Sequence, residues 1–123
     1  MSVAKSRLFR RLQSGKLRYQ GDYEGKILTL GDWAQEWLRR ELKRPNLKPR
    51  TKQDYANYVK ALERAPVMSV LFARLNGNQC LDWWREVNES VSPTTANSRL
   101  RVFRAVIVLA MEETRRLDNP TRK

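Results

Sequence analysis

The sequence contains no histidine and a single cysteine, Cys80. One cysteine cannot form an internal disulfide, and without histidine a zinc site would have to be built almost wholly from carboxylates. We therefore expect no metal ion and no cofactor. We interpret Cys80 as a small buried apolar residue, with a reactive thiol as the alternative.

Long apolar runs are also missing. No segment approaches the roughly 20 apolar residues that span a bilayer, and the N-terminus lacks the apolar segment of a secretory signal. This pattern predicts a soluble, cytoplasmic protein with no membrane partner.

Acidic residues are scarce: 13 Asp and Glu stand against 25 Lys and Arg, a net charge of +12. Such an excess favours nucleic acid as the partner first and an anionic membrane surface second. With 123 residues, 41% of them hydrophobic and four of them tryptophan, the chain is long enough for one domain with a small core.

Residues 1–28 are predicted to be a basic arm or linker. Residues 1–20 hold six basic side chains and no acidic one, with only a thin apolar stripe. A short helix through about Ser14 would be marginal without packing, and the glycine-interrupted stretch 16–27 is either a frayed hairpin or a linker.

Apolar residues recur at helical spacing in four segments after this arm, and no strand is predicted. Helices are expected over about 30–42, 52–65, 77–89 and 93–117. Pairs of capping residues precede the first three: Thr29 with Asp32, Thr51 with Asp54, and Asn76 with Gln79. Residues 66–75 are too irregular for a surface helix and are predicted to cross the core as a loop or short turn.

The helical periodicity places the two adjacent tryptophans of the third helix, Trp83 and Trp84, on different faces. Its inner face is predicted to carry Leu81, Trp84 and Val87. Trp83 would point away, either against a neighbouring helix or outward as an anchor for another chain.

The last helix has two dissimilar faces. Ser92 is a good N-cap and Pro93 suits the first helical position. The stripe of Ala96, Leu100, Phe103, Ile107 and Ala110 is predicted to face a core. The opposite side is polar or basic and free to contact a polyanion; it comprises Thr94, Asn97, Ser98, Arg101 and Arg104. Residues 106–111 are apolar all round, so Val108 and Leu109 are either enclosed or meet a second protein.

Three segments together resemble one family. They are Leu-Gly-Asp-Trp-Ala-Gln-Glu-Trp-Leu (30–38), Lys-Pro-Arg-Thr-Lys-Gln-Asp-Tyr (48–55) and Ser-Pro-Thr-Thr-Ala-Asn-Ser-Arg-Leu (92–100), followed by Asn119-Pro120. Residues 29–120 resemble the core-binding domain that precedes the catalytic domain in phage integrases and other tyrosine recombinases.

The resemblance implies an all-α, four-helix, SAM-like bundle that lies across the major groove of double-stranded DNA. It further implies a bacterial or phage-encoded protein whose partners are the catalytic domain and neighbouring recombinase protomers, with the isolated domain a monomer. DNA contacts in the family come mainly from the beginnings of the second and fourth helices. On this sequence the DNA-binding candidates are Lys48, Arg50, Thr51 and Lys52 at one edge, and Thr94, Thr95, Asn97, Ser98, Arg101 and Arg104 at the other.

The chain departs from the family where catalysis is concerned. Recombination needs a tyrosine nucleophile assisted by arginines, a lysine and a His-x-x-Arg element, and this chain has no histidine. We therefore expect a DNA-binding fragment and no enzyme, with residues 121–123 beginning a linker to a catalytic domain.

Two other interpretations stay open. One is a small basic helical adaptor or RNA- or protein-interaction module that binds through Trp83 or the Val108–Leu109 patch. The other is an independent excisionase-like or repressor protein.

Overall fold

The computed structural model describes residues 27–114, 116 and 119–121. This part of the chain forms four α-helices: α2 (Leu30–Leu42), α3 (Pro49–Leu62), α4 (Gly77–Ser90) and α5 (Pro93–Thr114). Two 3₁₀ turns, η1 (Pro66–Ser69) and η2 (Phe72–Arg74), connect α3 to α4. An isolated antiparallel bridge between Thr29 and Leu71 is the one strand-like pairing among the described residues. The predicted all-helical fold is thus confirmed for this part, whereas the arm falls outside it apart from Ile27 and Leu28.

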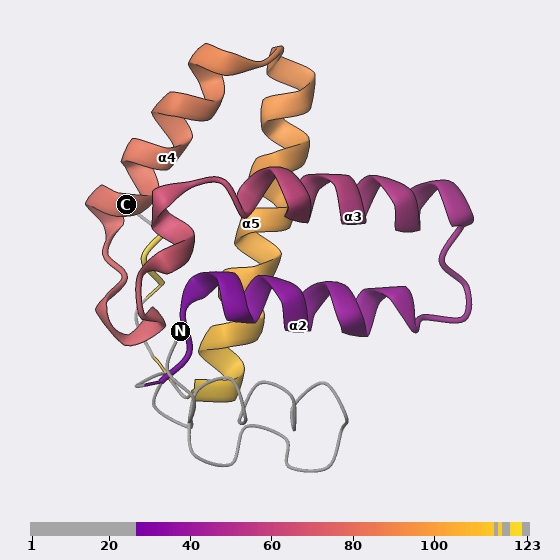
Figure 1. The fold of residues 1–123 in the computed structure, drawn as a ribbon, viewed down its shortest axis with the longest axis horizontal. Coiled ribbons are helices and arrows are strands. Elements are labelled where there is room, and N and C mark those ends of the chain that lie inside the picture. Colours follow the sequence, from indigo (N-terminus) through magenta and orange to yellow (C-terminus); the bar gives the residue numbers. More distant parts are fainter. Residues whose placement is uncertain (1–26, 115, 117–118, 122–123) are drawn as a thin grey trace.

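The long helix α5 is the axis of the fold. In Figure 1, α2 and α3 run antiparallel to one another and both cross α5, while α4 reaches the start of α5 through a short connection. Among the described elements, α2 and α5 make the most extensive contacts, followed by α2 and α3. The first and last described helices are therefore direct neighbours. No described helix has the length and apolarity needed to cross a membrane.

Helices α2 and α4 begin where their capping residues predict. The Thr29 backbone N–H donates to the Asp32 carboxylate at 2.9 Å, and the Asp32 N–H donates back to the Thr29 hydroxyl at 3.1 Å. Asn76 and Gln79 make the same reciprocal pair, both at 2.9 Å. These bonds satisfy N–H groups that the first helical turn leaves without partners.

Helix α3 begins three residues before its predicted start. Lys48 is the N-cap and Pro49 the first helical residue, so Thr51 lies inside the first turn and caps nothing. Proline has a fixed φ suited to a helix start and no N–H to leave unpaired, which explains the earlier start. The helix also ends at Leu62, short of the predicted Ala65.

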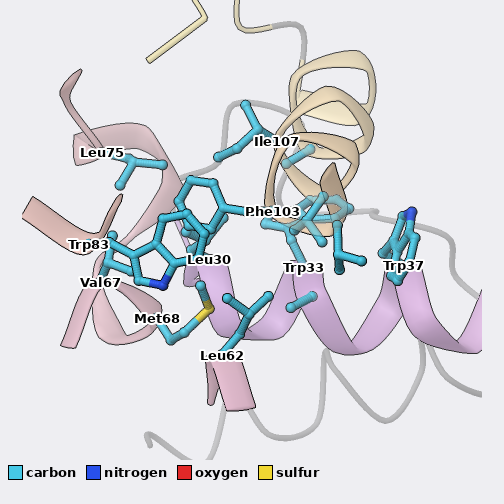
Figure 2. Packing of buried hydrophobic residues seen from close by; sticks show 14 of the residues in the cluster. Leu30, Trp33, Trp37, Leu62, Val67, Met68, Leu75, Trp83, Phe103 and Ile107 are labelled. Atoms are coloured by element: carbon cyan, nitrogen blue, oxygen red, sulfur yellow. The ribbon is translucent and has the colours of Figure 1, made fainter. Parts of the chain in front are cut away.

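The core is built around large side chains from several elements. Trp33, Phe72 and Phe103 are fully buried, and Figure 2 shows Trp83 packed beside Phe103 with Leu30 and Leu62 nearby. Segment 66–75 contributes to this core through η1 and η2, as the predicted short turns. The Trp83 and Phe103 rings are stacked, with centroids 4.1 Å apart and an angle of 11° between their planes.

The prediction for the α4 aromatic pair was right in one of its alternatives, that Trp83 packs against a neighbouring helix, and wrong in placing Trp84 on the inner face in preference to Trp83. Trp83 is only 5% exposed, while Trp84 and Leu81 are half-buried at the edge of the core. The physical reason is that α4 packs against both α5 and η1, so its buried side is set by two neighbours. Leu109 is also buried at 8% exposure, whereas Val108 is 45% exposed. The adaptor interpretation thereby loses Trp83 and Leu109 as surface anchors.

The two ends of α5 are held differently. The Ser92 hydroxyl accepts a hydrogen bond from the Thr95 N–H at 3.3 Å, as predicted. At the other end the helix stops at Thr114, earlier than the predicted Leu117. Arg116 is no longer helical and donates to the Phe72 and Leu75 carbonyls, both at 2.6 Å. Those carbonyls belong to η2 and its C-cap, so the chain leaving α5 is attached to that turn.

A buried carboxylate joins α2 to its surroundings. Glu36 is 2% exposed and accepts hydrogen bonds from Arg39 at 2.9 Å and from Arg40 at 3.1 Å. Arg40 also donates to Glu113 of α5 at 3.0 Å. This network fixes the C-terminal half of α2 against the end of α5.

Candidate nucleic-acid interface

A hollow of about 310 Å³ lies between α2, α3 and α5, and we call it the α3–α5 hollow. Trp37 and Val102 are buried residues in its lining. Tyr55 packs there against Trp37 with ring centroids 5.0 Å apart. The full lining comprises Trp37, Glu41, Thr51, Asp54, Tyr55, Tyr58, Ser98, Arg101, Val102 and Ala105.

The hollow brings together residues from both predicted edges. Thr51 comes from the first turn of α3, and Ser98 and Arg101 come from the second and third turns of α5. These residues are about 50 positions apart in the sequence and line one surface in the fold. Helix α5 crosses the later turns of α3 (Figure 1), and the hollow extends from this crossing to Thr51 near the start of α3.

The remaining α3 candidates flank the hollow. Successive residues of an α-helix are turned by about 100°, so Arg50 and Lys52 project to either side of Thr51. Arg50 is exposed, Lys52 is half-buried, and Lys48 is exposed at the helix start. Basic groups therefore border the hollow along the start of α3.

The α5 candidates divide into two groups. Asn97, Arg101 and Arg104 are all exposed and, at spacings of four and three, follow one outward line along the helix. Thr94 is exposed one turn before Ser98. Thr95 differs, because its hydroxyl accepts a hydrogen bond from Ser92 at 3.1 Å while its N–H is capped. Its role is at least in part to hold the helix start.

The start of α3 is open in a way that the other helix starts are not. Lys48 makes no side-chain cap, whereas side-chain oxygens cap α2, α4 and α5. Within the described chain, no side chain accepts from the first-turn N–H groups of Arg50 and Thr51. A helix start with free N–H groups carries partial positive charge and suits an anion.

The basic residues at and just after the end of α2 differ in their pairing from those near the hollow. Arg39, Arg40 and Arg44 each have a carboxylate partner within 3.1 Å. By contrast, the described residues offer no ion-pair partner to Arg101 in the lining of the hollow or to Lys48, Arg50 and Lys52 at the start of α3. Arg104 is also unpaired among these residues, but it lines a separate hollow between α4 and α5, with Cys80 and Trp84. Their charge is therefore uncompensated by contacts within this part of the protein.

Two carboxylates in the hollow were missed by the site prediction. Glu41 pairs with Arg44 at 2.9 Å, but Asp54 makes no ion pair or side-chain hydrogen bond among the described residues. Asp54 was predicted to complete a capping box with Thr51. Because α3 starts at Pro49, Asp54 lies in the second turn and is left without that role. The signal that identifies it is a carboxylate close in sequence to three basic DNA-contact candidates.

Cys80 is buried, as predicted, and lies apart from this hollow. Burial raises the pKa of its thiol to about 11, with the nearby Arg116 opposing the rise. In the described part of the chain no three metal-ligating side chains gather into a cluster. Comparison of this chain with protein-family models, with curated proteins and with solved structures gives no match.

Proposed function

We propose that this chain is a duplex DNA-binding module of the kind that precedes the catalytic domain in tyrosine recombinases, with the SAM-like arrangement of that family. It holds a recombination core site sequence-specifically, while strand cleavage belongs to another domain. The observation that carries the proposal is the α3–α5 hollow, where Thr51, Ser98 and Arg101 line one surface. These residues come from the two helix beginnings that the sequence resemblance assigns to DNA contact.

The charge distribution supports a polyanionic partner. Unpaired cations border the hollow in a chain of net charge +12. Lysine and arginine bind phosphate by charge, and the uncapped start of α3 adds N–H donors beside them. Lys48, Arg50 and Lys52 are therefore assigned to the DNA backbone, which fixes the position of the domain without reading sequence.

The polar line along α5 supports sequence reading. An exposed helix fits the major groove, where asparagine pairs bidentately with adenine and arginine with guanine. Asn97, Arg101 and Arg104 share one such line. Each good pair of this kind discriminates by about 1–3 kcal/mol. We assign Asn97 and Arg101 to base contacts.

A salt titration with matched and scrambled duplexes tests the proposal. If about 6–10 phosphates are neutralised, affinity falls by roughly three to five decades between 50 and 200 mM salt. Binding that is flat over this range would overturn the proposal. The full 123-residue chain is used, so the arm is present in every measurement.

Single substitutions separate the two kinds of contact. Lys48→Ala and Lys52→Ala are expected to weaken binding to all duplexes alike and to reduce the salt slope by about one each. Asn97→Ala and Arg101→Ala are expected to change the preference among duplexes. Arg85→Ala is the matched control, because Arg85 is an exposed α4 arginine that does not line the hollow. An equal effect of Arg85→Ala and Arg101→Ala on preference would contradict the assignment.

A further inference from the structure

Two opposite charges line the α3–α5 hollow without neutralising one another. Asp54 and Arg101 both belong to its lining, yet no ion pair within 4.0 Å joins them. Nearby, Glu41 and Arg44 do pair, at 2.9 Å. Among the described residues, Asp54 and Arg101 have no other hydrogen-bond or ion-pair partner. The hollow therefore presents a free acceptor from α3 and a free donor from α5.

Asp54 is difficult to explain by phosphate binding or by helix stability. A carboxylate among phosphate-binding cations repels the DNA backbone and lowers nonspecific affinity. Stabilisation by the helix macrodipole falls off beyond the first turn, and Asp54 is the sixth residue of α3. Among the described residues, no neighbouring side chain donates a hydrogen bond to the Asp54 carboxylate. A role in selecting the DNA sequence explains a carboxylate at residue 54, whereas a role in helix stability does not.

One base pair presents the complementary pattern. In the major groove, guanine offers the N7 and O6 acceptors that arginine binds, and cytosine offers the N4 amino donor that a carboxylate accepts. These groups lie next to each other because O6 and N4 are themselves base-paired. Adenine offers an amino donor too, but its adjacent N7 acceptor repels a carboxylate.

We propose that Asp54 and Arg101 together read a single G·C base pair, with the carboxylate accepting from cytosine and the guanidinium donating to guanine. This inference rests on the proposed function and adds to it a base pair and the two side chains that recognise it. In the complex each charge is compensated by the base edge and by the other charge. Asp54 thereby excludes base pairs that place an acceptor opposite it.

Selection from randomised duplexes, followed by affinity measurements on single base-pair variants of the selected site, tests the proposal. The unaltered chain is expected to prefer G·C at one position by about 5- to 150-fold over the other pairs. Asp54→Asn is expected to change the preferred base on the DNA strand that residue 54 contacts from cytosine to adenine, because an amide pairs bidentately with adenine N6 and N7. Arg101→Ala is expected to relax preference at the same base pair.

Glu89→Gln is the matched control. It removes one exposed carboxylate from α4, outside the hollow, so it matches the change in net charge of Asp54→Asn. It is expected to leave base preference unchanged and to raise nonspecific affinity less than Asp54→Asn, because Glu89 is not among the phosphate-binding cations. Unchanged helicity and melting temperature of Asp54→Asn are expected, since Asp54 makes no internal bond, and they establish that the variant folds.

The outcomes separate this inference from the proposed function. Binding of duplex DNA with identical base preferences for the unaltered chain and Asp54→Asn would overturn the inference alone. So would changes at two different base pairs for Asp54→Asn and Arg101→Ala. Failure of the unaltered chain to bind any duplex would overturn both.

Discussion

The adjacent tryptophans of α4 give a direct test of the packing. Trp83 is 5% exposed and stacks on Phe103 at 4.1 Å, whereas Trp84 is half-buried and contacts Trp83 in a tilted arrangement at 6.3 Å. Trp83→Ala removes a core aromatic and is expected to reduce the free energy of unfolding by about 3–5 kcal/mol. Trp84→Ala gives up less buried area, so a loss of at most about 2 kcal/mol is expected.

The expected loss of unfolding free energy for Trp83→Ala determines which assay is suitable. Small domains are typically stable by about 5–15 kcal/mol, so the Trp83→Ala loss is a large part of the total. Urea unfolding followed by circular dichroism at 222 nm is suitable, because helicity is retained as a signal when a tryptophan is removed. With a typical m-value of about 1–3 kcal/mol/M, the midpoint should fall by about 1 M or more.

A second variant covers the case in which Trp83→Ala does not fold. Trp83→Phe keeps an aromatic ring against Phe103 and is expected to lose less stability than Trp83→Ala. The reasoning is refuted if Trp84→Ala costs as much as Trp83→Ala, or if Trp83→Phe costs less than about 0.5 kcal/mol. Either result would mean that the side chain of Trp83 is not the one packed in the core.

Three further predictions follow from local structure. Thr29→Ala should cost about 0.5–2 kcal/mol of unfolding free energy because it removes a cap, while Thr51→Ala, measured in the same urea experiment, should cost less than about 0.5 kcal/mol. Glu36→Ala should cost about 1–3 kcal/mol, since two hydrogen-bonded arginines lose a buried acceptor but can turn toward water. The raised pKa of Cys80, about 11 against an ordinary value of 9.0, favours the neutral thiol in the fold, so its contribution is complete below pH 9 and is lost as the pH rises toward 11. Stability measured against pH for the unaltered chain and Cys80→Ser should therefore converge over that interval, and parallel curves would contradict the prediction.

Helix beginnings were predictable wherever one local signal acted alone. Thr29 and Asn76 form side-chain bonds only three residues apart, so sequence determines them almost completely. At the start of α3 two signals competed, a proline at residue 49 and a threonine at residue 51. The proline decided the outcome because its ring constrains the backbone directly, whereas a hydroxyl cap offers a single hydrogen bond.

Which side of a helix is buried was less predictable. The stripe on α5 was identified correctly, apart from Leu100, which is half-buried, because α5 is long enough for its period to be clear. Helix α4 is shorter and packs against two elements, so the choice between Trp83 and Trp84 depended on η1, whose position no local pattern specifies.

The candidate site was predictable in part for the same reason. Residue type and spacing placed Thr51, Ser98 and Arg101 on exposed helix beginnings, but only the crossing of α3 over α5 brings them to one hollow. Asp54 was assigned to a cap from its spacing, and its place in the hollow became evident once the helix was known to start earlier.

The packing of α2 against α5 has a consequence for synthesis of the chain. Residues 43–92 must be added before the first residue of α5 exists, and at about 5–20 residues per second this takes roughly 3–10 s. Throughout that interval the apolar side of α2, including Trp33, lacks its largest contact surface. The nascent domain therefore completes its core only after α5 has been synthesised. Until then, the tryptophans of α2 are not protected by α5 from aggregation and proteolysis.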